Sequence, residues 1–128
     1  MFRPLEGVRV LDLSRVLAGP YAAKLLQDLG ADVLRVEAPW GDDTRGWGPP
    51  FTEVNGDEVA AYWTSVNLGK QVIRRDLRKK EDLEDVRRLV ANADVILENF
   101  RPGRADAWFA PWPERAVVCS ITAYGPSR

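Results

Sequence analysis

The chain opens with an apolar segment, a one-sided helix and a second apolar segment, and this order constrains the fold more than any other feature. Residues 8–13 (VRVLDL) are rich in valine and leucine, which is typical of a strand buried on both faces of a parallel sheet. A predicted helix follows, with Pro20 in its first turn, Gly30 after its last, and one apolar face formed by Ala22, Leu25, Leu26 and Leu29. Residues 32–36 (DVLRV) read as a second buried strand. Together these segments predict a right-handed βαβ unit.

Three later segments repeat the apolar character of the first two strands, at residues 71–77, 94–98 and 116–121. A short helix is predicted at residues 59–65, and a longer one follows residue 80, with an apolar stripe at Leu83, Val86, Leu89 and Val90. Four or five parallel strands alternating with helices predict a doubly wound, Rossmann-like α/β sheet. Because 128 residues with 45% apolar and 29% charged side chains suit one globular unit, we expect residues 1–128 to form a single domain.

The chain contains no histidine and a single cysteine, Cys119, which is expected to be a small core residue of the last predicted strand. The absence of histidine removes Ser-His-Asp and Cys-His catalysis and argues against a metal site, so we predict none. Lys plus Arg (18) nearly balances Asp plus Glu (19), so no general charge attracts nucleic acid or an anionic membrane. Since no apolar run is long enough to span a bilayer and no signal peptide is evident, we expect a cytoplasmic protein.

Basic side chains gather in the loops that follow the predicted strands, where ligands bind in sheets of this kind. They lie in or beside residues 14–19, 37–43, 76–78, 99–104 and 122–128, as Arg15, Arg45, Arg78, Lys79, Arg101 and Arg104. The backbone N–H groups of residues 21–23, expected to be free at a helix start, would add to the attraction for anions. A nucleotide-like ligand with several phosphates fits this pattern, and arginines that only solvate the loops fit it equally well.

A dinucleotide site of the NAD type is the main alternative for such a sheet. Glu37 ends the second predicted strand about 20 residues after the first turn, where an acidic residue would bind the ribose. The turn itself (SRVLAGP) has one glycine where the dinucleotide fingerprint has three, and Pro20 removes a backbone N–H that would meet the pyrophosphate. The sequence therefore disfavours an NAD site.

Residues 38–58 form a long segment rich in glycine, proline and tryptophan, without the period of a helix or a strand. A segment of this length in a compact domain is either functional or disordered, and its aromatic residues argue against disorder. We expect four tryptophans to anchor irregular loops to the core rather than to stack on a ligand: Trp40, Trp47, Trp108 and Trp112. Trp63 is expected to pack within a helix.

Several stretches of the sequence resemble the class III CoA-transferase family, which includes formyl-CoA transferase, carnitine CoA-transferase and alpha-methylacyl-CoA racemase. The first stretch runs from PLEGVRVLDLSRVLAGP to EAPWGDDTRGWGPP, and ADVILENFRPG at residues 93–103 and SITAYG at residues 120–125 follow in order. The ENFRPG motif and the turn Ala18-Gly19-Pro20 are specific to this family. The resemblance spans nearly the whole chain and implies the N-terminal, coenzyme A-binding part of such an enzyme, truncated relative to the family.

The resemblance also implies which loops contact coenzyme A or an acyl-CoA, which is a substrate here and not a tightly bound cofactor. Residues 16–18 would line the nucleotide end, residues 75–78 the adenine and phosphates, residues 99–101 the next loop, and residues 121–124 the path to the thioester. Arginine forks suit phosphates, and Phe100 suits a wall for the pantetheine arm. The implied contact residues are Val16, Leu17, Ala18, Arg75, Asp76, Leu77, Arg78, Asn99, Phe100, Arg101, Arg104, Thr122, Ala123 and Tyr124.

The sequence departs from the family pattern at two positions and in its length. Ala38 and Ala107 stand where basic residues occur in the family, and Arg104 is the neighbour able to substitute for the second. The aspartate nucleophile of the transferases and the His/Asp pair of the racemases are implied to lie beyond residue 128, so we expect no catalytic residue in this chain.

Three explanations for the missing part stay open: a fragment, a split enzyme completed by a second chain, and a degenerate paralogue. Family members form interlocked homodimers, so the resemblance implies a homodimer or a complementing chain as the partner. A non-catalytic interaction or structural module stays open as the alternative function, because removal of covering chain exposes apolar faces.

Overall fold

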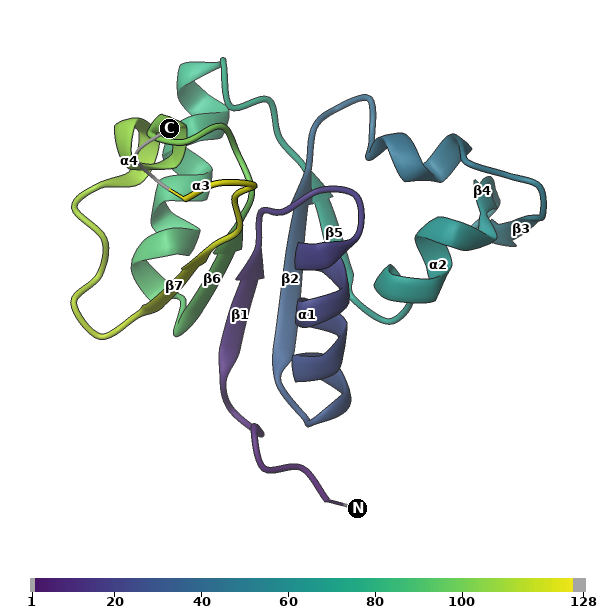
Figure 1. The fold of residues 1–128 in the computed structure, drawn as a ribbon, viewed down its shortest axis with the longest axis horizontal. Helices are drawn as coiled ribbons and strands as arrows, with labels where there is room; N and C mark the ends of the chain where they lie inside the picture. Colours follow the sequence, from purple (N-terminus) through teal and green to yellow (C-terminus); the bar gives the residue numbers. More distant parts are fainter. Residues whose placement is uncertain (1, 126–128) are drawn as a thin grey trace.

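The structure is a computed structural model and describes residues 2–125. Its elements in chain order are β1 (Arg9–Asp12), α1 (Ala18–Asp28), β2 (Asp32–Glu37), the 3-10 helix η1 (Asp43–Gly46), β3 (Phe51–Val54), β4 (Asp57–Ala60), α2 (Ala61–Asn67), β5 (Gln71–Arg74), α3 (Lys80–Asn92), β6 (Val95–Glu98), α4 (Arg104–Phe109) and β7 (Val117–Ser120). Figure 1 shows β3, β4 and α2 standing to one side of the main sheet.

The main sheet has five strands, all paired in parallel, in the order β5-β2-β1-β6-β7. The chain builds outward from β1 to β2 and β5, and then returns to the other side of β1 with β6 and β7. The strand order therefore reverses between β1 and β6, which is where ligands bind in open α/β sheets. The predicted doubly wound parallel sheet is confirmed, although the third predicted strand ends at Arg74 rather than at residue 77.

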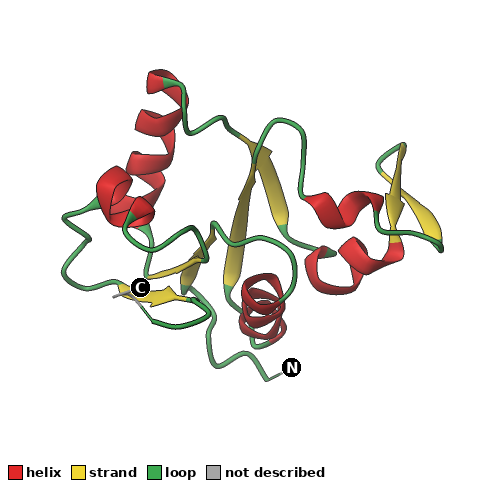
Figure 2. Ribbon diagram, turned by 45° about the horizontal axis from the view of Figure 1, so that its top comes forward, coloured by secondary structure: helices red, strands yellow, loops and turns green. Residues whose placement is uncertain are grey.

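Helices cover both faces of this sheet (Figure 2). On one face, Ala23 of α1 packs in a buried cluster with Val10 and Val33 of the first two strands. On the other face, Val86 of α3 and Phe109 of α4 pack in a second buried cluster. Side chains alternate along a strand, so each central strand contributes to both clusters, as the apolar runs predicted.

The start of α1 lies closely against the residues that follow β1. A Cβ atom at Gly19 would overlap the buried side chain of Ser14, so only glycine fits there. Gly30 has φ +106°, as expected for the residue that follows a helix. The N–H of Tyr21 already donates to the Leu17 carbonyl at 2.8 Å, because the helix begins at Ala18. The prediction of free N–H groups at residues 21–23 is therefore wrong.

The irregular segment at residues 38–58 contains more regular structure than its composition indicates. It includes η1 and the antiparallel hairpin of β3 and β4, whose turn places Asn55 and Gly56 at positive φ. The helix predicted at residues 59–65 begins only at Ala61, because Val59 and Ala60 pair with β3. The hairpin was not predicted because the segment is rich in glycine and proline, and because its two strands are short and mostly exposed.

Two of the four tryptophans expected to anchor loops to the core do not do so. Trp40 is 65% exposed and Trp47 is 49% exposed, so neither indole is held in the core. Trp112 does pack against the buried cluster of α3 and α4, and Trp108 packs against it as well, but from helix α4 and not from a loop. Trp63 is buried in α2, as predicted. Exposure of an aromatic ring depends on what packs over it, which a local pattern does not contain.

The prediction that Cys119 is a core residue is also wrong, because its side chain is exposed. It lies on β7, the edge strand, and α1 packs over β1, β2 and β6 instead. Val117, two residues away on the same face, is 63% exposed for the same reason. Among residues 2–125, no helix is both long enough and apolar enough to cross a membrane.

Candidate functional site

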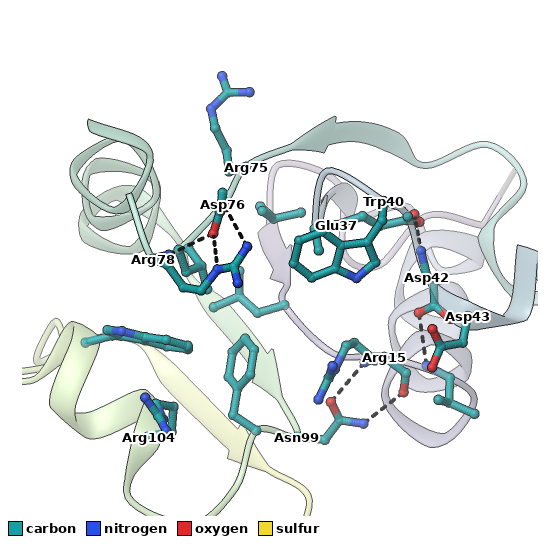
Figure 3. A pocket seen from close by; sticks show the side chains of 18 of the residues that line it. Arg15, Glu37, Trp40, Asp42, Asp43, Arg75, Asp76, Arg78, Asn99 and Arg104 are labelled. Atoms are coloured by element: carbon teal, nitrogen blue, oxygen red, sulfur yellow. Dashed lines mark hydrogen bonds and ion pairs between the residues drawn. The ribbon is translucent and has the colours of Figure 1, made fainter. Parts of the chain in front are cut away.

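A cavity of about 470 Å³ opens at the carboxyl edge of the main sheet, beside the point where the strand order reverses. Four loops line it, one after each of β1, β2, β5 and β6 (Figure 3). The residues that line it are Leu13, Arg15, Val16, Val36, Glu37, Ala38, Trp40, Gly41, Asp42, Asp43, Arg75, Asp76, Leu77, Arg78, Asn99, Phe100, Arg101, Arg104 and Trp108.

The cavity combines an apolar interior with a cationic rim. Leu13 and Val36 belong to the buried cluster under α3, and Leu77 and Phe100 pack against it. The rim carries exposed basic side chains from three loops, namely Arg15, Arg78, Arg101 and Arg104. An apolar hollow with cationic groups at its entrance suits a ligand that has a less polar arm and a polyanionic end.

Nine of the residues implied by the family resemblance line the cavity, and five do not. Those that line the cavity are Val16, Arg75, Asp76, Leu77, Arg78, Asn99, Phe100, Arg101 and Arg104. Those that do not line it are Leu17, Ala18, Thr122, Ala123 and Tyr124. Leu17 is half-exposed and precedes α1, and the last three residues follow the edge strand β7.

A buried ion-pair network that sequence reasoning missed lies beside the cavity, on the α1 face of the sheet. Its centre is Arg35 of β2, whose side chain is fully buried. The guanidinium donates from Nη1 to Asp12 at 3.0 Å, from Nε to Glu37 at 2.9 Å and from Nη2 to Asp42 at 2.5 Å. Burial opposes the charge on Arg35, but the carboxylates of Asp12, Glu37 and Asp42 outweigh it and raise the pKa.

Glu37 links the network to η1 and α2. Burial alone would raise the pKa of this carboxyl, but hydrogen bonds from Arg45 and the charge of Arg35 lower it to about 2. The Nε1–H of Trp63 and the backbone N–H of Asp42 also donate to it, each at 2.9 Å. Every one of these donors comes from the protein, so Glu37 is occupied and the ribose contact required by an NAD site has no acceptor there.

Lys70 closes the network from the loop before β5. Its Nζ donates to Asp12 at 2.9 Å, to Asn67 at 2.8 Å and to the Pro20 carbonyl at 2.8 Å, which uses all three of its protons. Burial lowers the pKa of Lys70, and Asp12 partly offsets this effect. No buried side-chain nitrogen or oxygen among the described residues lacks a hydrogen-bond partner. The network is therefore a satisfied structural unit rather than a reactive one.

The network and a second clamp fix the shape of the first cavity loop. Asp42 accepts the N–H of Val16 at 3.1 Å. Val16 has φ +71°, which is costly for a β-branched residue and persists only when its surroundings impose it. The side-chain amide of Asn99 accepts the N–H of Arg15 at 2.9 Å and donates to its carbonyl at 2.8 Å. Asn99 thus joins the loops after β1 and β6, and acts as a positioning residue.

Asp76 fixes Arg78 at the opposite side of the cavity. Arg78 donates from Nε at 3.0 Å and from Nη2 at 3.1 Å to the two carboxylate oxygens of Asp76. These hydrogen bonds lower the pKa of Asp76 and raise that of Arg78, so both stay charged. The guanidinium of Arg75, in contrast, points away from the cavity towards Asp85 (Figure 3). Arg78 is therefore the cation of this loop that is placed for a ligand.

Three network members carried a signal in the sequence. Asp12, Arg35 and Glu37 interrupt strands that are otherwise apolar, and charged residues inside buried strands require partners. Asp12 and Arg35 are register partners across β1 and β2, which only the paired strands reveal. The indole of Trp40, also missed, lines the cavity.

The arrangement is suited to binding a ligand, and most of its carboxylates already have partners within the protein. Three of the carboxylates that line the cavity, those of Glu37, Asp42 and Asp76, are ion-paired with arginines. Among residues 2–125, no group of three or more His, Cys, Asp or Glu side chains is placed to hold a metal ion.

Known proteins match this chain along nearly its whole length. The succinate–glutarate CoA-transferase of Agrobacterium fabrum is 46% identical over 95% of this chain and 33% of its own length. The succinyl-CoA:mesaconate CoA-transferase of Haloarcula hispanica is 52% identical over 97% of this chain and 33% of its own length. The crystal structure of a CAIB/BAIF family protein from Brucella suis superposes with a TM-score of 0.93 at 46% identity, covering 100% of this chain and 35% of that one.

This chain spans about a third of the length of the curated relatives that it matches. The sequence pattern that defines CoA-transferase family III matches residues 5–127. The fold, the position of the cavity and these matches agree with one another. The chain therefore belongs to CoA-transferase family III.

Proposed function

We propose that this chain binds coenzyme A and acyl-CoA in the cavity at the carboxyl edge of its sheet, as the N-terminal part of a CoA-transferase. The observation that carries the proposal is the convergence of four strand-end loops on one cavity with an apolar interior and an arginine rim. Coenzyme A has a pantetheine arm and three phosphates, and it matches both features. It would bind as an exchangeable substrate, in the cytoplasm.

The relatives favour a dicarboxylic acyl group on the donor. Those from Agrobacterium fabrum and Haloarcula hispanica are named for succinate with glutarate and for succinyl-CoA with mesaconate. We therefore propose that the whole protein transfers CoA from succinyl-CoA or a similar dicarboxylic thioester to another carboxylic acid. Three of the four cavity-lining carboxylates, those of Glu37, Asp42 and Asp76, are ion-paired. The family resemblance implies a nucleophile beyond residue 128, so we propose that it would come from outside this chain.

Isothermal titration calorimetry with coenzyme A tests the binding proposal directly. We expect saturable heat at one site per chain, and competition by succinyl-CoA. The affinity should fall as salt is added, because exposed arginines contact the phosphates. NAD serves as the negative control, since Glu37 is occupied. A folded protein that gives no saturable heat with coenzyme A would contradict the proposal.

The outer face of α1 supports a second, compatible proposal about a partner. Leu17, Tyr21, Leu25 and Leu29 recur every four residues and are 44%, 53%, 48% and 41% exposed. Residues four apart lie along one side of a helix, so these side chains form a continuous apolar stripe. We propose that a second copy or a complementing chain covers this stripe.

Light scattering after size-exclusion chromatography tests the partner proposal. The protein at increasing concentration should self-associate, and the double variant Tyr21→Lys, Leu25→Lys should shift the population towards the monomer. Val117→Lys is the control, because it changes an even more exposed apolar residue on β7, and it should leave the population unchanged. A wild-type monomer at all concentrations, with no binding to its own copies, would contradict the homodimer.

A further inference from the structure

Of the two tryptophans that line the cavity, Trp40 and Trp108, Trp40 is the more exposed. Its backbone is nevertheless held in place by hydrogen bonds. The N–H of Gly41 donates to the Ala38 carbonyl at 2.8 Å, which closes a tight turn around Trp40. Arg74 donates from Nη1 to the Pro39 carbonyl at 2.8 Å and ties this turn to β5. The indole itself is 65% exposed. A rigid turn therefore presents the Trp40 indole at the cavity and leaves most of the ring exposed.

Arg78 lies over this ring. Its Cζ atom is 5.2 Å from the centroid of the Trp40 ring, within the range of a cation–π contact. Asp76 takes the Nε and Nη2 donors of Arg78, which leaves Nη1 outside that ion pair. Figure 3 shows the indole extending across the cavity towards Arg78. An exposed aromatic ring and a fixed cation thus contact each other at the entrance.

We propose that Trp40 is a stacking platform for a planar heteroaromatic ring, with Arg78 holding a phosphate attached to the same ligand. This inference rests on the proposed function, in which the ring is the purine base of coenzyme A. Bases stack on indole faces through contacts that require a planar partner. Ala38, two residues earlier, offers no side chain long enough to take this part. Within residues 38–41, Trp40 would therefore be the residue on which the base stacks.

Calorimetry with coenzyme A on three Trp40 variants tests the platform. Trp40→Ala should weaken binding roughly five- to hundredfold, the range measured for loss of one base–aromatic stack. Trp40→Phe, which keeps a planar ring, should stay within a factor of about three of the wild type. Trp40→Leu, which is apolar but not planar, should lose as much affinity as the alanine variant.

Trp47→Ala is the matched control, because Trp47 is similarly exposed and does not line the cavity. It should bind coenzyme A like the wild type, and thermal melting should show that all variants fold. Wild-type binding that Trp40→Ala leaves unchanged would overturn the platform and leave the proposed function standing. Equal binding by the leucine and phenylalanine variants would also overturn it, because any apolar cover would then suffice. A wild type that does not bind coenzyme A would overturn both.

Discussion

Replacing Arg35 by methionine should leave the chain unable to fold stably. The substitution keeps an unbranched side chain, although a shorter one, and removes the cation that pairs with Asp12, Glu37 and Asp42. Removing one partner of a buried ion pair costs about 3–5 kcal/mol, because the other charge stays buried without compensation. Three carboxylates share this cation, and the whole stability of a domain is only about 5–15 kcal/mol. Of these three carboxylates Lys70 pairs with Asp12, so its ammonium group does not replace the Arg35 cation at Glu37 and Asp42.

Urea unfolding followed by far-ultraviolet circular dichroism measures this effect. Arg35→Met should show either no cooperative transition or a strongly lowered midpoint. Arg88→Met is the matched control, because the Arg88 side chain is 70% exposed and pairs only with Asp85 on the same helix. That change should alter stability by less than about 1 kcal/mol. Equal midpoints for Arg35→Met and the wild type would show that the network is not needed for folding.

The elements of the sheet were predictable because each depends on residues close in sequence. The apolar runs identified all five strands, and the pattern between Pro20 and Gly30 identified α1. The hairpin at residues 51–60 was not predictable, because its exposed strands carry no alternating apolar face. The exposure of Cys119 and Trp40 depends on which element packs over them, and that information is not local.

The site followed from the sequence only in part, for a related reason. Strand-end positions brought Arg78, Asn99 and Arg101 to one cavity, as parallel topology requires. The sequence did not predict the role of each residue at the cavity. Asn99 braces the Arg15 backbone and Arg75 turns towards Asp85, and each outcome depends on a partner in a different loop or helix. A residue type indicates which contacts a side chain can make, and the packing decides which it does make.

Reversing the charge of Arg78 should have the largest effect on ligand binding. We expect Arg78→Glu to weaken coenzyme A binding roughly hundredfold or more, since a charge-assisted hydrogen bond is lost and a repulsive charge takes its place. The Arg78 side chain is 72% exposed, so the variant should fold like the wild type in a thermal melt. Calorimetry at one fixed salt concentration gives the affinity of each protein for coenzyme A. At a higher salt concentration, the difference in affinity between the wild type and Arg78→Glu should be smaller.

The control for this experiment must separate a local contact from the net charge of the protein. Arg88→Glu makes the same change in net charge on the exposed side of α3, with a side chain that is 70% exposed, and should change the affinity little. If both variants weaken binding equally, the arginines attract the ligand only through the general field of the protein. If Arg78→Glu alone weakens it, the phosphates lie where Asp76 holds the Arg78 guanidinium, at the entrance to the cavity.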